Sequence, residues 1–166
     1  MSVQSGVREI VALIDQYKLN TRLFNNVIEE ITEEKSNEKL SDNTNNVKWL
    51  VGHLLNARYG IANLIGVMEE DPNEDMFGHG KSIEEDIKYP SISSLRKQWN
   101  EFSPSMINKL ESMTEDDLNK KAPFQLPIED HTILGAISFF AHHEAYHIGQ
   151  LGILRKYLDY GSMKYV

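Results

Sequence analysis

The sequence predicts an all-α fold, an antiparallel four-helix bundle with a long crossover loop between its second and third helices. Apolar residues recur at steps of three and four in four separate segments, which is the spacing of an amphipathic helix. Alternating apolar runs are short, and no hairpin dipeptide lies between two of them, so the signals for strands are weak. Four helices with one long connection are typical of a bundle.

The first two helices are predicted by apolar stripes on either side of a polar loop. The loop runs from Lys35 to Ser41. The second helix begins near Asn43 or Thr44, because either side chain can accept a hydrogen bond from the first helical turn. The two stripes consist of Val7, Ile10, Ile14, Tyr17, Thr21, Phe24, Ile28 and Ile31, and then of Leu50, Leu54, Ala57, Ile61, Leu64 or Ile65, and Met68.

The long connection lies between Glu69 and Pro90. This stretch contains Pro72, Gly78, Gly80 and many acidic residues, and it has no sustained apolar period. Because proline and glycine interrupt regular structure, we expect an irregular crossover loop here.

The third helix runs from about Ser91 to Leu110, and Pro104 falls inside its apolar pattern. Proline lacks a backbone donor and clashes with the preceding turn, so we expect it to kink or split the helix. Thr114 and Asp117 follow and resemble a capping box that opens one short turn of helix.

The fourth helix begins near Asp130 and continues to about Tyr157, after a loop bracketed by Pro123 and Pro127. It is the longest of the predicted helices, and two histidines lie on its apolar stripe. The stripe consists of Ala136, Phe140, His143, His147, Leu151, Leu154 and Leu158.

Length and composition indicate one domain that spans residues 1–166. The chain has no cysteine, which excludes disulfides, thiolate metal ligands and a cysteine nucleophile, and which fits a reducing compartment. The first residues lack the basic region and apolar run of a signal peptide, and no apolar run is long enough for a membrane span. We therefore expect a cytoplasmic protein that does not bind membranes.

The formal net charge of -8 argues against a nucleic-acid partner. A protein that binds nucleic acid without regard to sequence needs a basic face, and no cluster of lysine and arginine offsets the acidic excess. The excess more simply serves solubility.

His143 and His147 predict a metal site. Their spacing places both imidazoles on one face of a helix, one turn apart, which is the geometry that a divalent cation needs from a single helix. His53 is the best candidate for a third ligand, because it lies beside Leu50 and Leu54 on the inward side of the second helix. Side chains from facing helices meet in the core of a bundle, so the three imidazoles can converge.

The other three histidines fit the site less well. His142 points about a quarter-turn away from His143, so we expect it to be exposed or to support a ligand. His131 lies about three turns from the pair, too far for the same ion. His79 lies in a glycine-flanked loop and could reach over the bundle as a fourth ligand or lid residue.

The segment from His143 to His147 also spells H-E-x-x-H, the helix motif of many metalloproteases, in which the glutamate is a general base. Two features argue against such a hydrolase: Gln150 and Ile153 stand where one class has glycine and histidine, and the only acid after His147 is Asp159. Glu144 remains a candidate catalytic base or hydrogen-bond acceptor.

Four other residues near these motifs are interpreted from their positions. Gln150, one turn after His147, is a candidate catalytic residue that orients this histidine or a substrate. Arg58 pairs with an acidic substrate or, as the commoner alternative, forms an exposed helix ion pair. Trp49 is core or site wall, and Tyr146 is packing.

Two motifs carry a resemblance to a known family. The segment His143-Glu144-Ala145-Tyr146-His147-Ile148-Gly149-Gln150-Leu151, followed by Arg155, resembles the last-helix motif of the DinB-like (YfiT-related) family. The segment from Asn46 to Arg58 resembles its second-helix motif, in which a histidine follows a tryptophan at the distance that separates Trp49 from His53.

The resemblance implies an antiparallel four-helix bundle, often a homodimer, that binds nickel or zinc through His53, His143 and His147. It also implies a metal-dependent transferase that uses a low-molecular-weight thiol such as bacillithiol or mycothiol, or a thiol-dependent isomerase. Ile148 departs from the family pattern, since many members carry an arginine there, and this departure puts a contact with an anionic substrate in doubt.

We therefore expect a divalent-metal-binding bundle that conjugates a low-molecular-weight thiol to a small electrophile. Three neutral imidazoles leave the charge of a cation uncompensated, so a bound water or thiol ionises near neutral pH. Imidazole ligands do not choose between zinc and nickel. The alternatives are a non-catalytic metal- or ligand-binding bundle and a helical interaction module without a metal.

Overall fold

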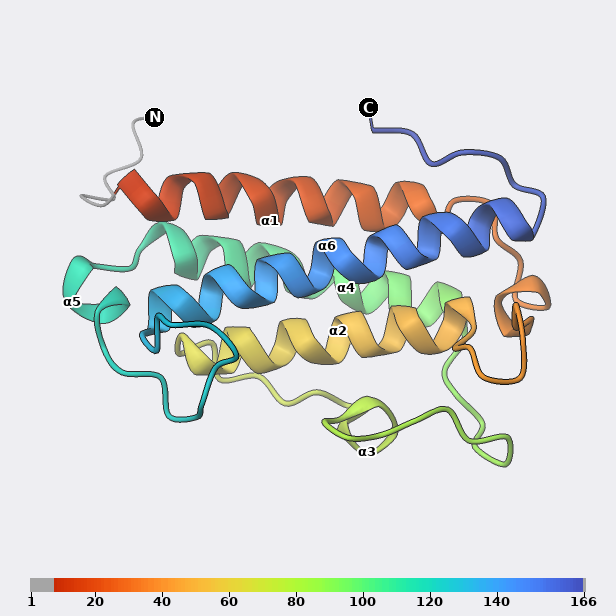
Figure 1. Cartoon of the computed structure of the whole chain (residues 1–166), viewed down its shortest axis with the longest axis horizontal. Helices are drawn as coiled ribbons and strands as arrows, with labels where there is room; N and C mark the ends of the chain where they lie inside the picture. Colours follow the sequence, from red (N-terminus) through yellow and green to blue (C-terminus); the bar gives the residue numbers. More distant parts are fainter. Residues whose placement is uncertain (1–7, 166) are drawn as a thin grey trace.

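Four long helices make up most of the protein. The structure is a computed structural model that describes residues 8–165 (Figure 1). The long helices are α1 (Arg8–Val27), α2 (Val47–Leu64), α4 (Ile92–Glu111) and α6 (Ile133–Tyr157), and the short ones are η1 (Lys35–Asn37), α3 (Glu74–Phe77) and α5 (Glu115–Leu118). Between residues 8 and 165 the only β-type pairing is an isolated bridge of Lys121 with Thr132. The prediction of an all-α fold is confirmed.

The four long helices pack side by side, and α1 and α2 each contact both α4 and α6 (Figure 1). Helices α1 and α6 run parallel, because Tyr17 Oη donates to the carbonyl of Ile137 at 2.9 Å and Arg155 Nη1 donates to that of Val27 at 3.3 Å. Helices α2 and α4 are also parallel, since the crossover returns the chain to the end where α2 began. The neighbouring pairs α1–α4 and α2–α6 are antiparallel, so the expected antiparallel arrangement holds for these two pairs.

The first two helices are shorter than their apolar stripes. Helix α1 ends at Val27, although Ile28 and Ile31 are buried in the turns that follow. Val7, the predicted start of this stripe, lies outside the described residues. Helix α2 ends at Leu64, and Met68 is 86% exposed.

The cap predicted for α2 was wrong. The oxygen of Asn46, rather than Asn43 or Thr44, accepts a hydrogen bond from the amide of Trp49 at 2.8 Å. The hydroxyl of Thr44 instead donates to the carbonyl of Ser41 at 2.8 Å, which uses it in the preceding turn.

The crossover is less irregular than predicted, because α3 forms within it and packs on α2. Phe77, at the end of α3, is completely buried, and its ring lies 6.4 Å from the Trp49 ring. A Cβ atom at Gly52 would lie 2.1 Å from Phe77 Cζ, so only glycine allows this ring to sit against α2. The crossover is therefore attached to α2 at the residue before His53.

Helix α4 is continuous through Pro104, so the predicted split does not occur. Phe102 and Met106, on either side of the proline, are both buried, and their packing outweighs the one missing backbone hydrogen bond. The predicted capping box of Thr114 and Asp117 is present at the start of α5.

Helix α6 begins at Ile133 rather than Asp130, since Thr132 caps it by accepting from the amide of Gly135 at 3.2 Å. Its buried face is rotated from the predicted stripe, because α6 packs on both α1 and α2. The stripe predicted His143 and His147 on the inward face, but both are half-buried on the flank toward α2. The most buried positions are Ala136, Ile137, Ala141, Glu144, Ile148 and Leu151.

None of the helices between Arg8 and Tyr165 combines the length and the apolar character that a membrane span requires.

Candidate metal centre

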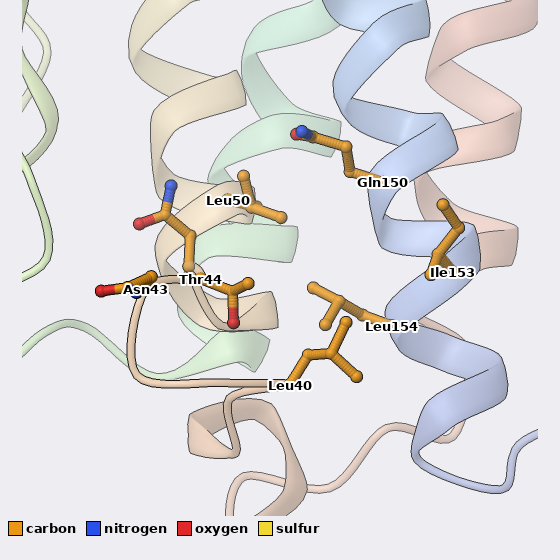
Figure 2. A pocket seen from close by; sticks show the side chains of 8 residues that line it. Leu40, Asn43, Thr44, Leu50, Gln150, Ile153 and Leu154 are labelled. Carbon is orange, nitrogen blue, oxygen red and sulfur yellow. The ribbon is translucent and has the colours of Figure 1, made fainter.

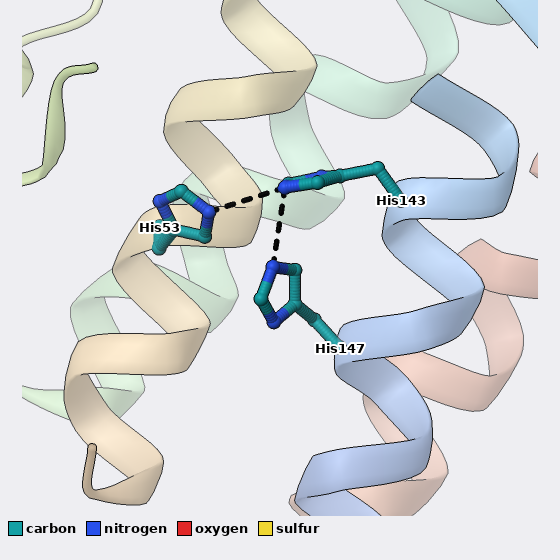
Figure 3. Close-up of side chains that lie close together, drawn as sticks. All are labelled: His53, His143 and His147. Atoms are coloured by element: carbon teal, nitrogen blue, oxygen red, sulfur yellow. Dashed lines mark hydrogen bonds between the residues drawn. The ribbon is translucent and has the colours of Figure 1, made fainter. Parts of the chain in front are cut away.

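Three histidines from two helices point their ring nitrogens at one another (Figure 3). His53 lies on α2, and His143 and His147 lie one turn apart on α6. His143 Nε2 is 3.2 Å from His53 Nε2 and 3.1 Å from His147 Nε2, and one nitrogen from each ring lies within 4.8 Å of the others. The structure thus brings together the three residues that the sequence predicted as ligands.

The packing of α2 against α6 accounts for this convergence. The two helices are antiparallel neighbours, so a residue on one flank of α2 faces two successive turns of α6. The His53 ring is stacked on that of Trp49, with 5.1 Å between centroids and 10° between planes. Trp49 is buried and touches Phe77 in turn, so it forms the wall behind His53, as predicted.

Gln150 holds the ring of His147. The amide oxygen Oε1 of Gln150 lies 2.6 Å from His147 Nδ1, and its nitrogen Nε2 donates to the hydroxyl of Tyr146 at 3.2 Å. Because Oε1 accepts, Nδ1 of His147 carries the proton and its Nε2 presents a lone pair to the cluster. This is the orienting role predicted for Gln150. Tyr146, predicted to be packing, is 56% exposed.

The histidines are held in the neutral state that metal binding requires. Burial lowers the pKa of His53 to about 4, with a smaller contribution from His147, and the backbone of Phe77 acts weakly in the opposite direction. Burial also lowers the pKa of His143 to about 4, again with His147 next, and burial lowers that of His147. All three rings are therefore uncharged at pH 7.

The donor set and its spacing fit a transition metal. In tetrahedral coordination with zinc–nitrogen bonds of about 2.0–2.1 Å, ligand nitrogens lie about 3.3–3.4 Å apart, close to the separations around His143. The nitrogens that face one another are Nε2 on all three rings, an atom through which neutral histidine binds metals. Three imidazoles without carboxylates suit zinc, nickel, copper and iron alike, and they leave coordination positions for other ligands.

Glu144 does not face the cluster, so its predicted role as a hydrogen-bond acceptor is confirmed and its placement speaks against the catalytic base. Its side chain is 1% exposed, and Arg58 donates to both of its oxygens, from Nε and from Nη2, each at 2.7 Å. Asn20 also donates to Glu144, at 3.1 Å. The carboxylate points toward α1 and the core-facing side of α2, because a one-residue step on a helix turns a side chain by more than a quarter of the circle.

Arg58 is fully buried, so both predictions for it, a contact with substrate and an exposed ion pair, were wrong. Its Nη1 donates to the hydroxyl of Thr21 at 2.8 Å and to that of Ser103 at 2.7 Å. The guanidinium lies 3.5 Å from the centre of the Trp99 ring. These contacts, together with the pair to Glu144, join all four long helices at one point.

The remaining histidines lie outside the cluster. His142 is exposed, in agreement with one of its predicted placements. His131 is exposed, and its Nδ1 accepts from the amide of Leu126 at 3.5 Å. His79 is exposed at the edge of a pocket that also reaches His53, but it is not one of the three clustered residues.

An apolar pocket of about 590 Å³ opens beside His53 and His143. Its walls come from α2, from α6 and from the loop before α6, where Phe124 and Leu126 lie between two prolines. The sequence predicted only a loop for this segment. The presence of two apolar side chains between two prolines was the one signal in the sequence that this loop forms part of a pocket wall.

A second pocket, of about 290 Å³, lies beyond Gln150 on the other side of the cluster (Figure 2). Asn43 and Thr44 supply amide and hydroxyl groups from the loop before α2, and Leu50 and Ile153 supply apolar surface. No charged residue lines this pocket. The histidine cluster is thus flanked by one aromatic pocket and one pocket with a mixed lining of amide groups and aliphatic side chains.

Comparison with known proteins identifies the family. No curated protein matches the sequence. A family model described as the DinB superfamily matches residues 16–151, which include all three clustered histidines and most of the chain. The chain therefore belongs to the DinB superfamily.

Proposed function

We propose that this protein binds one zinc or nickel ion through His53, His143 and His147 and conjugates a low-molecular-weight thiol to a small electrophile. The convergence of three neutral ring nitrogens between two pockets is the observation that carries the proposal. A dication held by these three residues would lower the pKa of a bound thiol and so would supply a nucleophile near neutral pH.

The residues of the chain contribute position and environment to this reaction. Gln150 keeps the lone pair of His147 directed at the cluster. The pocket beyond Gln150, with amide groups and aliphatic side chains in its lining, suits a small thiol, and the aromatic pocket suits the electrophile. The sulfur loses its proton to solvent and forms a bond to carbon, and the leaving group departs with its electron pair.

Glu144 has no part in this proposal. Both of its oxygens are used by Arg58 inside the core, so it cannot take a proton from water at the cluster. The same placement removes the general base that an H-E-x-x-H hydrolase needs.

The second candidate is a bundle in which the metal serves stability alone. It is favoured by the contact chain from His53 through Trp49 to Phe77, which links the cluster to the crossover. In this case removal of the metal loosens α3 from α2 and no thiol is consumed.

We also propose that the protein forms a homodimer, as the family resemblance implies. Exposed apolar residues on α6, including Tyr146, Ile153 and Tyr157, support an interface on that helix. Light scattering after gel filtration measures the mass, and a value of one chain at micromolar concentration contradicts the dimer.

Elemental analysis of protein prepared without a histidine tag tests the metal. We expect about one zinc or nickel ion per chain and a loss of the ion in His53→Ala. Protein that holds no metal after incubation with either ion contradicts both candidates and leaves a helical interaction module.

Conjugation assays then separate the two candidates. Metal-loaded protein is mixed with cysteine, coenzyme A, glutathione, bacillithiol or mycothiol and with the electrophile 1-chloro-2,4-dinitrobenzene. We expect product formation that depends on the metal and is lost in His147→Ala. Bound metal without turnover of any thiol favours the purely structural role.

A further inference from the structure

The aromatic pocket exists because small residues line it on the side of α2. After His53, the positions on the same flank of this helix are Ala57 and Gly60, one and two turns further on, and both line the pocket. A Cβ atom added at Gly60 would meet open space. Side chains of facing helices normally fill the space between them, so the small residues at these two positions leave room for a ligand.

The other wall of the pocket is aromatic. Phe139 and Phe140 come from α6, and Phe124 comes from the preceding loop. The rings of Phe139 and Phe140 lie 5.4 Å apart at 77°, and the Phe140 ring lies 6.0 Å from that of His143. Phe124 is 44% exposed, so part of its ring stays in contact with water until a ligand covers it. A ligand next to the histidines therefore gains free energy by burying aromatic surface.

Charge favours a neutral ligand in this pocket. Among the described residues that line it, Glu74 is the one carboxylate, and none is a lysine or arginine. Glu74 is exposed, so water screens its charge. A dication on His53, His143 and His147 would repel a cationic ligand. An anion lying along the phenylalanine rings would lose its hydration and find no basic side chain to pair with. A neutral ligand bears neither cost.

The volume of the pocket suits a ligand larger than a single ring. It is about 590 Å³, within the range of small-molecule sites. An engineered apolar cavity of about 150 Å³ is large enough to bind benzene. A ligand of about two or three rings therefore fits, with part of its surface still open to solvent.

We infer that the pocket beside His53 and His143 binds a neutral aromatic molecule of about two or three rings, and that Gly60 and Phe124 determine this specificity. The inference deepens the proposed function and rests on it in one respect: because the pocket reaches two of the clustered histidines, the bound molecule is the electrophile. Its reactive carbon lies at the histidines, and its rings lie along the phenylalanine side chains.

Titration calorimetry with unreactive probes tests the inference. Benzyl alcohol and 2-naphthalenemethanol are neutral and differ by one ring. We expect the naphthalene compound to bind metal-free protein about tenfold more tightly, because its second ring buries additional apolar area. In zinc-loaded protein, naphthalene probes that carry a sulfonate or a trimethylammonium group should bind more weakly than the alcohol. Equal affinities of the two alcohols, or tighter binding of either ion, overturn the inference.

Two substitutions at Gly60 fill the pocket without removing a contact. Gly60→Leu places a side chain in the open space, and we expect the affinity for 2-naphthalenemethanol to fall at least about tenfold. Gly60→Ala adds less volume and should lower the affinity less. Both changes replace glycine inside a helix, so the midpoint of urea unfolding should not fall, which separates a filled pocket from a damaged fold. Unchanged affinity in Gly60→Leu places the ligand elsewhere and overturns the inference.

Phe124 and Ile128 offer a matched pair in the same loop. They are 44% and 37% exposed, but Ile128 is not part of the pocket lining. We expect Phe124→Ala to weaken binding of 2-naphthalenemethanol about fivefold and Ile128→Ala to leave it unchanged. Equal losses in the two variants overturn the role of Phe124.

Turnover tests whether the bound molecule is the electrophile. The thiolate forms a bond to the benzylic carbon of 1-(chloromethyl)naphthalene or of benzyl chloride, and chloride leaves with its electron pair. We expect a higher kcat/KM for the naphthalene compound, and equal values overturn the assignment of the pocket to the electrophile. The titrations need neither thiol nor turnover. A protein that binds 2-naphthalenemethanol but conjugates nothing therefore contradicts the proposed function and leaves the aromatic binding site standing.

Discussion

The histidine cluster and the Arg58–Glu144 pair lie on the same two helices but differ in how far their hydrogen bonds are satisfied. Arg58 uses Nε, Nη1 and Nη2 as donors, and Glu144 accepts with both oxygens, deep in the core. The cluster is half-buried, and its Nε2 atoms face one another, 3.2 Å apart between His53 and His143 and 3.1 Å apart between His143 and His147. A polar group that is fully satisfied by the protein holds the structure, whereas ring nitrogens that face only one another are available to a ligand.

The two regions also depend on each other through helix register. Glu144 directly follows His143, and Arg58 lies little more than a turn beyond His53. The bidentate pair therefore fixes how far α2 can slide or rotate against α6. This constraint sets the separations between the three ring nitrogens.

The largest effect is expected from loss of one partner of the buried pair. Glu144→Ala leaves the guanidinium of Arg58 buried without a counter-charge, and we expect the free energy of unfolding to fall by about 3–5 kcal/mol. Urea unfolding of the metal-free protein measures the change. The double variant Arg58→Met with Glu144→Leu serves as the control, because replacing both charges by apolar groups should cost less than the single change. A single variant within about 1 kcal/mol of the wild type contradicts a structural role for the pair.

Substitutions in the histidine cluster should change the affinity for metal more than the free energy of unfolding. His143 lies between the other two rings, so we expect His143→Ala to weaken zinc binding by more than about 100-fold in competition with a chelator, beyond what loss of a supporting partner costs. Unfolding of the metal-free form should change little. His142→Ala, at the adjacent exposed position, is the matched control and should bind zinc as the wild type does. Equal affinities of the two variants would place the metal elsewhere.

Gln150 should have a smaller effect on the same measurement. Gln150→Leu removes the acceptor for His147 Nδ1, and we expect zinc affinity to fall about 10- to 100-fold. Gln150→Glu keeps an acceptor at that position and should restore most of the affinity. If both variants bind zinc equally well, the orientation of His147 does not depend on this contact.

A separate effect concerns pH and the metal-free protein. The pKa values of His53 and His143 are about 4 in the folded state, below the ordinary 6.5, so the unfolded chain takes up protons first as pH falls. The contribution of these rings is fully present above about pH 6.5 and is lost as pH falls toward 4. We expect a lower free energy of unfolding at pH 5 than at pH 7.5 in urea titrations with a chelator. His53→Gln should flatten this dependence, and an unchanged slope would contradict burial as the cause.

Sequence alone determined the helical fold and the candidate ligands, because both depend on spacing along the chain. Apolar steps of three and four predict helices wherever the chain is placed, and His143 and His147 share a flank in any α-helix that contains them. His53 could be added because its helix must face another helix in a bundle.

The direction of each polar side chain in the core was decided by tertiary structure. Glu144 and Arg58 looked like site residues because they lie close to histidines along the chain. Helix α6 packs on both α1 and α2, and Glu144 points between them, where it meets Asn20 of α1 and Arg58 of α2. Local spacing cannot show which of two neighbouring helices a given flank will face.

The pockets also required the folded chain. Phe124, Glu74 and Phe139 come from three separate segments, and only the packing of the crossover and the loop before α6 brings them to one wall. Helix periodicity depends on neighbours within two turns, so the sequence determined the helices and the histidine spacing. A cavity depends on segments far apart in the chain, so only the tertiary structure decided what surrounds the histidines.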